Sequence, residues 1–210
     1  MTALSALPDH PDIARLREAL EARPGRRIEA ENEIVRLAAI ALVLRPGVDG
    51  HPEMLMIKRA EAERDPWSGH VACPGGRMEP GDADLAQTAI RETWEETGVD
   101  LARDGRVLGT LDDITPRSPV LPAIIVRPFV AVVKPEVEIV QSSEVAEAFW
   151  VPIAALRERA AWGTGMVPVR GEGERSVTVF RHGAYTVWGL TERVLRQFLE
   201  YLEPLEPLEG

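Results

Sequence analysis

The chain has 210 residues, is 45% hydrophobic and carries a formal net charge of -10 at pH 7, so it has enough apolar material for one globular domain. The acidic balance argues against general nucleic-acid binding, because phosphate contacts require lysine and arginine gathered on one face. No run approaches the roughly eighteen consecutive apolar residues of a membrane span, so a soluble protein is expected.

A helix is predicted near the start of the chain, over residues 10–22. Its apolar side chains recur at the spacing of one helix face, and they are Ile13, Leu16 and Leu20. Pro24 and Gly25 follow directly and end the helix. We therefore expect residues 1–30 to form a helical extension that packs on the main domain.

Two features of the sequence indicate a cytoplasmic protein. The N-terminus lacks the basic stretch followed by an apolar run that marks a secretory signal. Cys73 is the only cysteine and cannot pair within the chain, which fits a reducing compartment. Its place between Ala72 and Pro74 favours a small core residue over a nucleophile.

Short apolar runs bounded by turn residues predict the strands of a sheet. The first two runs, residues 37–44 and 54–57, are separated by Pro46 and Gly47 and indicate two buried strands joined by a turn. Three further candidates lie at 107–111, 123–133 and 146–151.

Helices alternate with these strands along the chain. One is expected near 153–160 and a last one near 190–202. Such alternation predicts an α/β fold whose sheet is covered by helices on both faces. Residues 204–210 are acidic and interrupted by prolines, and we expect this tail to be flexible.

The most informative pattern is a predicted helix over residues 84–97. Asp84 and Gln87 have the spacing of a capping box, and Gly98 stands where a left-handed C-terminal cap belongs. An apolar stripe that would face the core consists of Leu85, Ala89 and Ile90.

Glu92, Glu95 and Glu96 occupy positions i, i+3 and i+4 of this helix, so their carboxylates project from one face. Like charges this close repel unless a cation neutralises them, and oxygen ligands select hard divalent ions such as Mg²⁺ or Mn²⁺. The turn at Gly75 and Gly76 brings bare backbone near the helix, where a phosphate or a metal can approach. The pattern predicts a metal site aimed at a diphosphate, and the alternative is a solvated acidic helix face.

Residues 76–99 resemble the Nudix box, the signature of hydrolases acting on nucleoside diphosphates linked to another moiety. The matching positions are Gly76, Arg91, Glu92, Glu95, Glu96 and Gly98. Three positions depart from the family pattern. Asp82 replaces a glutamate, eight residues instead of seven separate it from Arg91, and Thr93 replaces an apolar residue. None of these departures affects the three glutamates expected to bind the metal, Glu92, Glu95 and Glu96.

The resemblance implies a Nudix-type α/β/α sandwich with a mixed sheet between helices, formed here by residues 31–203. It also implies that Glu95 and Glu96 are the principal ligands of Mg²⁺ or Mn²⁺. Glu92 and the backbone carbonyl of Gly76 would assist them.

Catalytic roles follow from the same resemblance. We expect Glu96 to be essential for hydrolysis. A glutamate outside the box often completes the site in this family, and Glu144 lies in a polar run suited to a loop, with surface exposure as its alternative. Glu92 and Glu144 are the two candidates for the base that takes the water proton. Arg91 would orient a glutamate, although a surface pair with Glu95 explains the same spacing.

The segment before the box resembles the additional motif of the coenzyme A diphosphatases within the Nudix family. Arg59 matches its start, and Gly69 keeps the spacing to the glycine turn. Cys73 replaces a phenylalanine, and Asp65 stands where an arginine is expected, with Arg64 one step away. Later segments similar to the same subfamily lie at 126–130, 143–152 and 187–191.

This segment and the box supply the candidate substrate contacts, which are Arg59, Arg64, Trp67, Gly75 and Gly76. Trp67 lies in a predicted loop, where its ring could stack on a nucleobase. Three further tryptophans, Trp94, Trp150 and Trp188, are expected in the core, with stacking on an adenine as the alternative. Arg117 lies between prolines in a loop, where it could reach a substrate phosphate or simply be exposed.

Three functions follow from this reading. The first is a metal-dependent diphosphatase that cleaves coenzyme A, or a thioester of it, to adenosine 3′,5′-bisphosphate and 4′-phosphopantetheine or its acyl form. The second uses the same metal site on nucleotide sugars, ADP-ribose or nucleoside triphosphates. The third is a nucleotide-binding module that has lost catalysis, which the presence of all three glutamates disfavours. The partner in each case is a small nucleotide, with no nucleic acid and no membrane. Dimers are common for this fold, so a homodimer is compatible with it.

Overall fold

The computed structural model describes residues 10–30, 35–63, 65, 67–117, 123–169 and 173–202. Arg64 and the tail at 204–210 lie outside the described residues. The elements in chain order are α1 (Pro11–Ala22), β1 (Arg36–Pro46), β2 (Pro52–Arg59), β3 (Val71–Ala72), β4 (Gly75–Arg77), α2 (Leu85–Thr97), α3 (Leu101–Asp104), β5 (Gly105–Thr110), β6 (Ile124–Val133), β7 (Val145–Pro152), α4 (Ile153–Arg157), β8 (Trp162–Val169), β9 (Gly173–His182), β10 (Tyr185–Trp188) and α5 (Gly189–Leu202).

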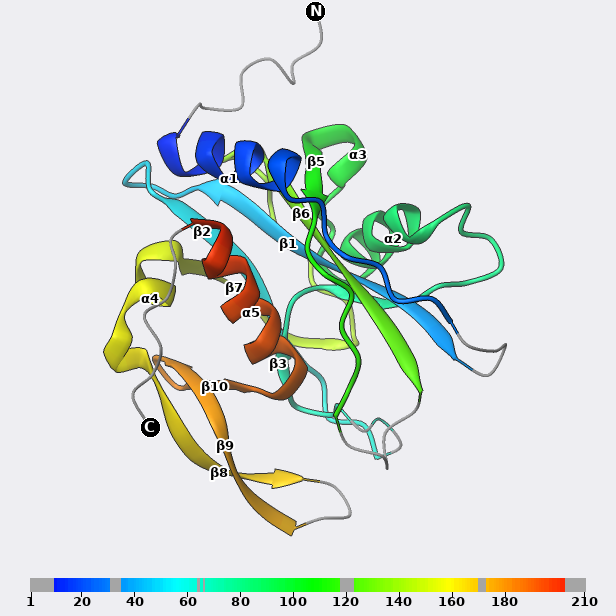
Figure 1. Cartoon of the computed structure of the whole chain (residues 1–210), viewed down its shortest axis with the longest axis vertical. Coiled ribbons are helices and arrows are strands. Elements are labelled where there is room, and N and C mark those ends of the chain that lie inside the picture. Colours follow the sequence, from blue (N-terminus) through cyan, green and yellow to red (C-terminus); the bar gives the residue numbers. More distant parts are fainter. Residues whose placement is uncertain are drawn as a thin grey trace, which may run out of the picture.

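A mixed sheet of seven strands is formed within the described residues, with β1 at its centre (Figure 1). β1 runs parallel to β6 and antiparallel to β2 and β4. β5 pairs with the outer side of β6, while β3 and β7 pair with β2. The mixed sheet implied by the sequence is thus confirmed.

Both faces of β1 are buried, because each face carries its own core. Leu42 and Leu44 point into the core beneath α1 and α5, whereas Ala41 and Val43 point into the core beneath α2 and α3. A strand buried on both faces reads as a continuous apolar run, which is why this strand was predictable. Figure 1 shows α1 and α5 lying over the near face of the sheet, so the expected α/β/α layering is confirmed.

A second sheet, not predicted from the sequence, contains β9 paired antiparallel with both β8 and β10. Most side chains of β8 and β9 are exposed or half-buried, so these strands contain no continuous apolar run. The helix expected near 153–160 was wrong in length, since α4 ends at Arg157 and a short 3₁₀ turn follows at Arg159–Ala161.

Two single residues test expectations about the core. Cys73 is buried, and burial raises the pKa of its thiol to about 12, which keeps it protonated and confirms a core role. Trp94 was expected in the core but is 57% exposed. It lies about 100° around α2 from the buried Thr93, on the side turned away from the sheet.

The segment after α1 is fastened to the loop that follows β5. Arg26 donates to the Asp112 carboxylate from both its backbone N and its Nε, each at 2.8 Å. The Ile28 backbone N donates to Asp113 at 3.0 Å. The hydroxyl of Tyr201 in α5 donates to the Arg23 carbonyl at 3.2 Å. These contacts join the start of the chain to β5 and to its last helix.

Candidate active site

Helix α2 begins and ends at the residues that the sequence indicated. The Asp84 side chain accepts a hydrogen bond from the Gln87 backbone N at 2.8 Å. The Gln87 side chain in turn accepts from the backbone N of Ala83 at 2.9 Å. Gly98 closes the helix in the left-handed region, with φ 71° and its N donating to the Trp94 carbonyl at 2.8 Å. The caps fix which side chains of the helix face the sheet.

Glu96 is the most buried carboxylate of this helix, with 3% of its surface exposed. One oxygen accepts a hydrogen bond from the Gly75 backbone N at 2.8 Å, and the other lies 3.4 Å from Nη1 of Arg59. Burial raises the pKa of Glu96 to about 7, and the negative charges of Glu92 and Glu144 add to this effect. An added positive charge would therefore stabilise the carboxylate.

Arg91 holds the other two box glutamates. Its Nη1 donates to Glu92 at 3.0 Å and to Glu95 at 2.9 Å. Glu92 is half-buried, and burial raises the pKa of its carboxyl despite the arginine. The contact with Glu95 is the i,i+4 pair that the sequence offered as an alternative. Arg91 also donates to Asp82 and to the Arg77 carbonyl, so its pair with Glu95 is one part of a larger hydrogen-bond network.

Asp82 anchors Arg91 through two parallel hydrogen bonds, from Nε and Nη2, both at 2.9 Å. The same carboxylate accepts from the Thr88 hydroxyl and from the Glu79 backbone N, each at 2.9 Å. These donors hold the pKa of Asp82 well below its usual range. From the sequence, Asp82 was identified only as a departure from the family pattern. Its position nine residues before Arg91 was a signal that could have indicated an acidic partner for this arginine.

The two glycines of β4 bring backbone against the helix and the central strand. Gly75 has φ 151°, and a Cβ there would collide with backbone atoms of Ala39 and Ile40. A Cβ at Gly76 would instead collide with the carboxyl group of Glu92. Because β4 pairs with β1, the backbone cannot retreat at either position.

These two collisions predict different outcomes for alanine substitutions. Gly76→Ala should fold, since the Glu92 side chain can rotate aside, but it should lose about tenfold or more in hydrolysis because that carboxylate is displaced. Gly75→Ala should lower the melting temperature, because it meets backbone. Thermal melts and turnover measured on both variants check this contrast. Full turnover in folded Gly76→Ala would show that the position of Glu92 is unimportant.

Arg59 lies at the end of β2 and connects the substrate segment to the box. Its Nε and Nη2 donate to Asp65 at 3.0 and 2.8 Å, while Nη1 faces Glu96. The other Asp65 oxygen accepts from the Trp67 backbone N at 3.0 Å. Asp65, which occupies the place where an arginine was expected, therefore orients Arg59 and the Trp67 loop. The Trp67 side chain is half-buried.

Glu144 is exposed in the loop between β6 and β7, as its polar neighbours predicted. This loop is tied to the site at two points. The Ala60 N donates to the Glu144 carbonyl at 2.8 Å, and the Ser142 N donates to the Glu96 carbonyl at 3.1 Å. The Glu144 charge contributes to the raised pKa values of Glu92 and Glu96, so its carboxylate lies within electrostatic reach of both.

The donor chemistry of the site fits a hard divalent cation. Three carboxylates contact Arg91 and two contact Arg59, and carboxylate oxygen is the ligand that Mg²⁺ and Mn²⁺ prefer. Burial and the charges of Glu92 and Glu144 raise the pKa of Glu96, so a bound cation would favour its ionised form. Across the described residues, no group of three or more acidic, histidine or cysteine side chains is already arranged so that it could hold a metal ion.

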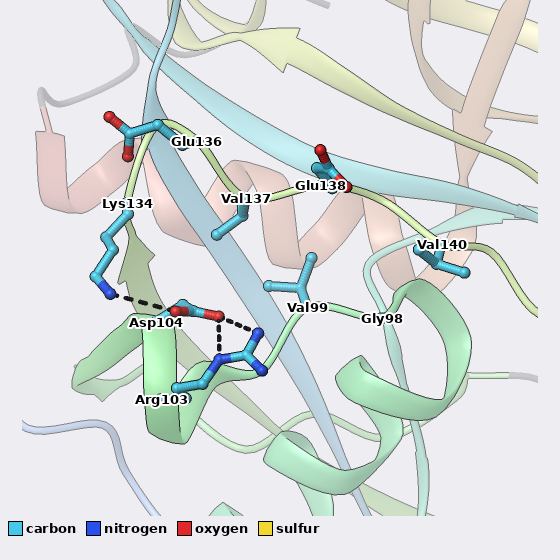
Figure 2. A pocket seen from close by; sticks show the side chains of 9 residues that line it. All are labelled: Gly98, Val99, Arg103, Asp104, Lys134, Glu136, Val137, Glu138 and Val140. Carbon is cyan, nitrogen blue, oxygen red and sulfur yellow. Dashed lines mark hydrogen bonds and ion pairs between the residues drawn. The ribbon is translucent and has the colours of Figure 1, made fainter.

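A separate cavity of about 450 Å³ lies beyond the C-terminal end of α2. Figure 2 shows Arg103 and Lys134 both paired with Asp104 there. The shortest nitrogen–oxygen distances of these ion pairs are 2.5 and 3.3 Å. Val137 and Val140 form part of the same wall. None of the residues predicted for the active site lines this cavity.

Comparisons with known proteins place the chain in a family. Residues 35–169 match the family model described as NUDIX domain. The mitochondrial coenzyme A diphosphatase NUDT8 of Homo sapiens is 33% identical over 157 residues, which cover 73% of this chain and 65% of that protein. An uncharacterized protein of Schizosaccharomyces pombe is 39% identical over 110 residues, covering 50% of this chain and 33% of the other. The chain thus spans less than two thirds of the length of either relative.

The fold has a counterpart among solved structures. A MutT/nudix family protein from Enterococcus faecalis is 18% identical, with a TM-score of 0.56 over 92% of this chain and 71% of that one. Among the helices described, none has the length and apolar character needed to cross a bilayer. Because the domain model accounts for well over half of its length, the chain belongs to the Nudix hydrolase family.

Proposed function

We propose that the protein is a divalent-metal-dependent diphosphatase that cleaves coenzyme A, or a coenzyme A thioester, at its diphosphate bridge. The observation that supports this most directly is the buried Glu96, held by the Gly75 backbone N and facing Arg59. The similarity to coenzyme A diphosphatases, together with the Arg59 segment that resembles their additional motif, favours this substrate class.

In the proposed reaction, water attacks one phosphorus of the bridge, and the bond from that phosphorus to the bridging oxygen breaks. Bound Mg²⁺ or Mn²⁺ would lower the pKa of the attacking water and neutralise the non-bridging oxygens. The side chains of Glu92, Glu95 and Glu96, with the Gly76 carbonyl, would hold the cation. Glu92 or Glu144 would accept the proton from the water.

Arginines would set the geometry of this reaction. Arg91, fixed by Asp82, holds Glu92 and Glu95 in place, so its role is to position them. Arg59 faces the same carboxylate cluster from the end of β2 and would bind a phosphate oxygen of the bridge. Gly75 and Gly76 keep the backbone bare beside it, and Trp67 would contact the base.

The alternative substrates are nucleotide sugars, ADP-ribose and nucleoside triphosphates, which would use the same carboxylates. A nucleotide-binding module without catalysis is the least favoured reading. A cytoplasmic location and a homodimer stay predictions, which cell fractionation and light scattering would test. No contact with nucleic acid or membrane is part of this proposal.

A substrate panel tests the proposal. Coenzyme A, acetyl coenzyme A, ADP-ribose, GDP-mannose and dNTPs would be assayed side by side with Mg²⁺ and with Mn²⁺. We expect the highest kcat/KM for coenzyme A or its thioester, with release of adenosine 3′,5′-bisphosphate, and no turnover once EDTA removes the cation. A preference for ADP-ribose or a sugar nucleotide would move the assignment to the alternative class. Metal-independent turnover would contradict the mechanism.

A further inference from the structure

Two arginines, Arg193 and Arg117, lie together where α5 meets the loop after β5. Arg193 is in the first half of α5 and is half-buried. Its Nη1 donates to the Thr115 carbonyl at 2.7 Å. Arg117 follows two residues later in the same loop and is exposed. Burial lowers the pKa of Arg193, and the positive charge of Arg117 lowers it further.

The carboxylates near these arginines are occupied by other cations. Glu192 is bound by Arg196 at 2.7 Å. Asp113 is bound by Arg127 at 2.9 Å. In the part of the chain that the structure describes, no ion pair joins Arg117 or Arg193 to a carboxylate. The protein carries ten more negative than positive charges, so two neighbouring cations without an ion pair among the described residues require a local reason.

This pair lies at the end of a chain of contacts that starts at the active site. Arg59 faces Glu96 through its side chain, and its backbone N donates to the His70 carbonyl at 3.0 Å. The His70 ring contacts the Trp188 ring, with centroids 4.4 Å apart. Trp188 directly precedes α5, the helix that carries Arg193. These contacts connect the strand that carries Arg59 to the helix that carries Arg193.

We propose that Arg117 and Arg193 bind a second anionic group of the substrate, a phosphate monoester on the nucleoside, separate from the diphosphate that is cleaved. This inference rests on the proposed function. Guanidinium groups bind phosphate oxygens in a planar, two-pronged geometry, and two of them match a dianionic monoester. In coenzyme A that group is the 3′-phosphate of the ribose. The pair would select substrates that carry it.

The test compares coenzyme A with dephospho-coenzyme A, which lacks only the 3′-phosphate. The native protein should have the lower KM for coenzyme A. Arg117→Gln and Arg193→Gln should each raise the KM for coenzyme A about tenfold, because each variant loses a hydrogen bond to a charged group. Both should leave kcat and the KM for dephospho-coenzyme A unchanged. Arg181→Gln is the matched control, because Arg181 is exposed and also donates to a backbone carbonyl, that of Thr164.

A second measurement keeps the inference independent of turnover. Calorimetry would compare the binding of adenosine 3′,5′-bisphosphate and AMP to the native protein and to Arg117→Gln, whose exposed side chain is not needed for folding. The inference is supported if the native protein binds the bisphosphate more tightly than AMP and Arg117→Gln does not. Equal affinities, or equal losses for both ligands, overturn it. If no coenzyme A derivative is hydrolysed, the proposed function fails, and the calorimetric comparison still decides the role of the arginines.

Discussion

Replacing Glu96 with glutamine is expected to lower hydrolysis of every diphosphate substrate by about a thousandfold. The glutamine keeps the shape of the side chain and an oxygen that accepts from the Gly75 N, but it removes the charge that the cation requires. Steady-state turnover with saturating Mg²⁺ or Mn²⁺ measures the loss. Glu136→Gln, which changes an exposed glutamate of the loop before β7, should leave turnover unchanged.

Stability measurements separate this loss from unfolding. The folded-state pKa of Glu96, about 7, lies above its value in the unfolded chain, so its contribution to stability is present at low pH and is lost as pH rises toward and through 7. In buffer with EDTA, Glu96→Gln should therefore be at least as stable as the native protein at pH 8. Unchanged turnover in this folded variant would remove Glu96 from the mechanism.

Arg91→Met is expected to lower the free energy of unfolding by about 2 to 3 kcal/mol, the cost of leaving a buried carboxylate without its charged partner. Only 4% of the Asp82 side chain is exposed, and Arg91 supplies two of its hydrogen bonds. Turnover should also fall, because Glu92 and Glu95 lose the side chain that holds them. Arg103→Met is the control, since it disrupts an exposed pair and should change little.

The pH dependence of the free energy of unfolding tests whether Asp82 is the partner through which Arg91 stabilises the fold. Arg91 keeps the pKa of Asp82 low in the folded state. The stability that the Asp82 carboxylate contributes is therefore fully present above its pKa in the unfolded chain, about 3.9, and is lost as the pH falls below that value. Urea unfolding at pH 7 and pH 3 should show a larger drop for the native protein than for Arg91→Met. Equal drops in the two proteins would mean that Asp82 gains its stability elsewhere.

The parts of the fold that were predictable are those whose residues carry a local signal. α2 has its cap at Asp84, its stop at Gly98 and an apolar stripe between them, so its ends followed from neighbouring residues alone. β1 is buried on both faces and therefore stands out as an apolar run. β9 is largely exposed and pairs with other half-exposed strands, so only tertiary pairing defines it.

The candidate site likewise has features that local sequence predicts and features that only the folded chain defines. The three glutamates were identified from helical spacing, which is a local property. The same spacing indicated the pair of Arg91 with Glu95. The partners of Glu96 were not identified, because its contacts with Gly75 and Arg59 join residues 21 and 37 positions apart. Asp65 shows the same limit. It stands where an arginine was expected, and only the folded structure shows that it orients Arg59 instead.

The segment that follows α1 determines how this protein can be shortened. Gly25 packs so tightly on the Leu111 carbonyl that any side chain there would overlap it, and the Asp113 carboxylate beside it is fully buried. Deleting the first thirty residues would strip backbone and arginine donors from Asp112 and Asp113 and uncover the apolar surface beneath Leu16. A catalytic fragment that begins after residue 30 should thus be prone to aggregate, because residues 10–30 cover α5 and the loop after β5.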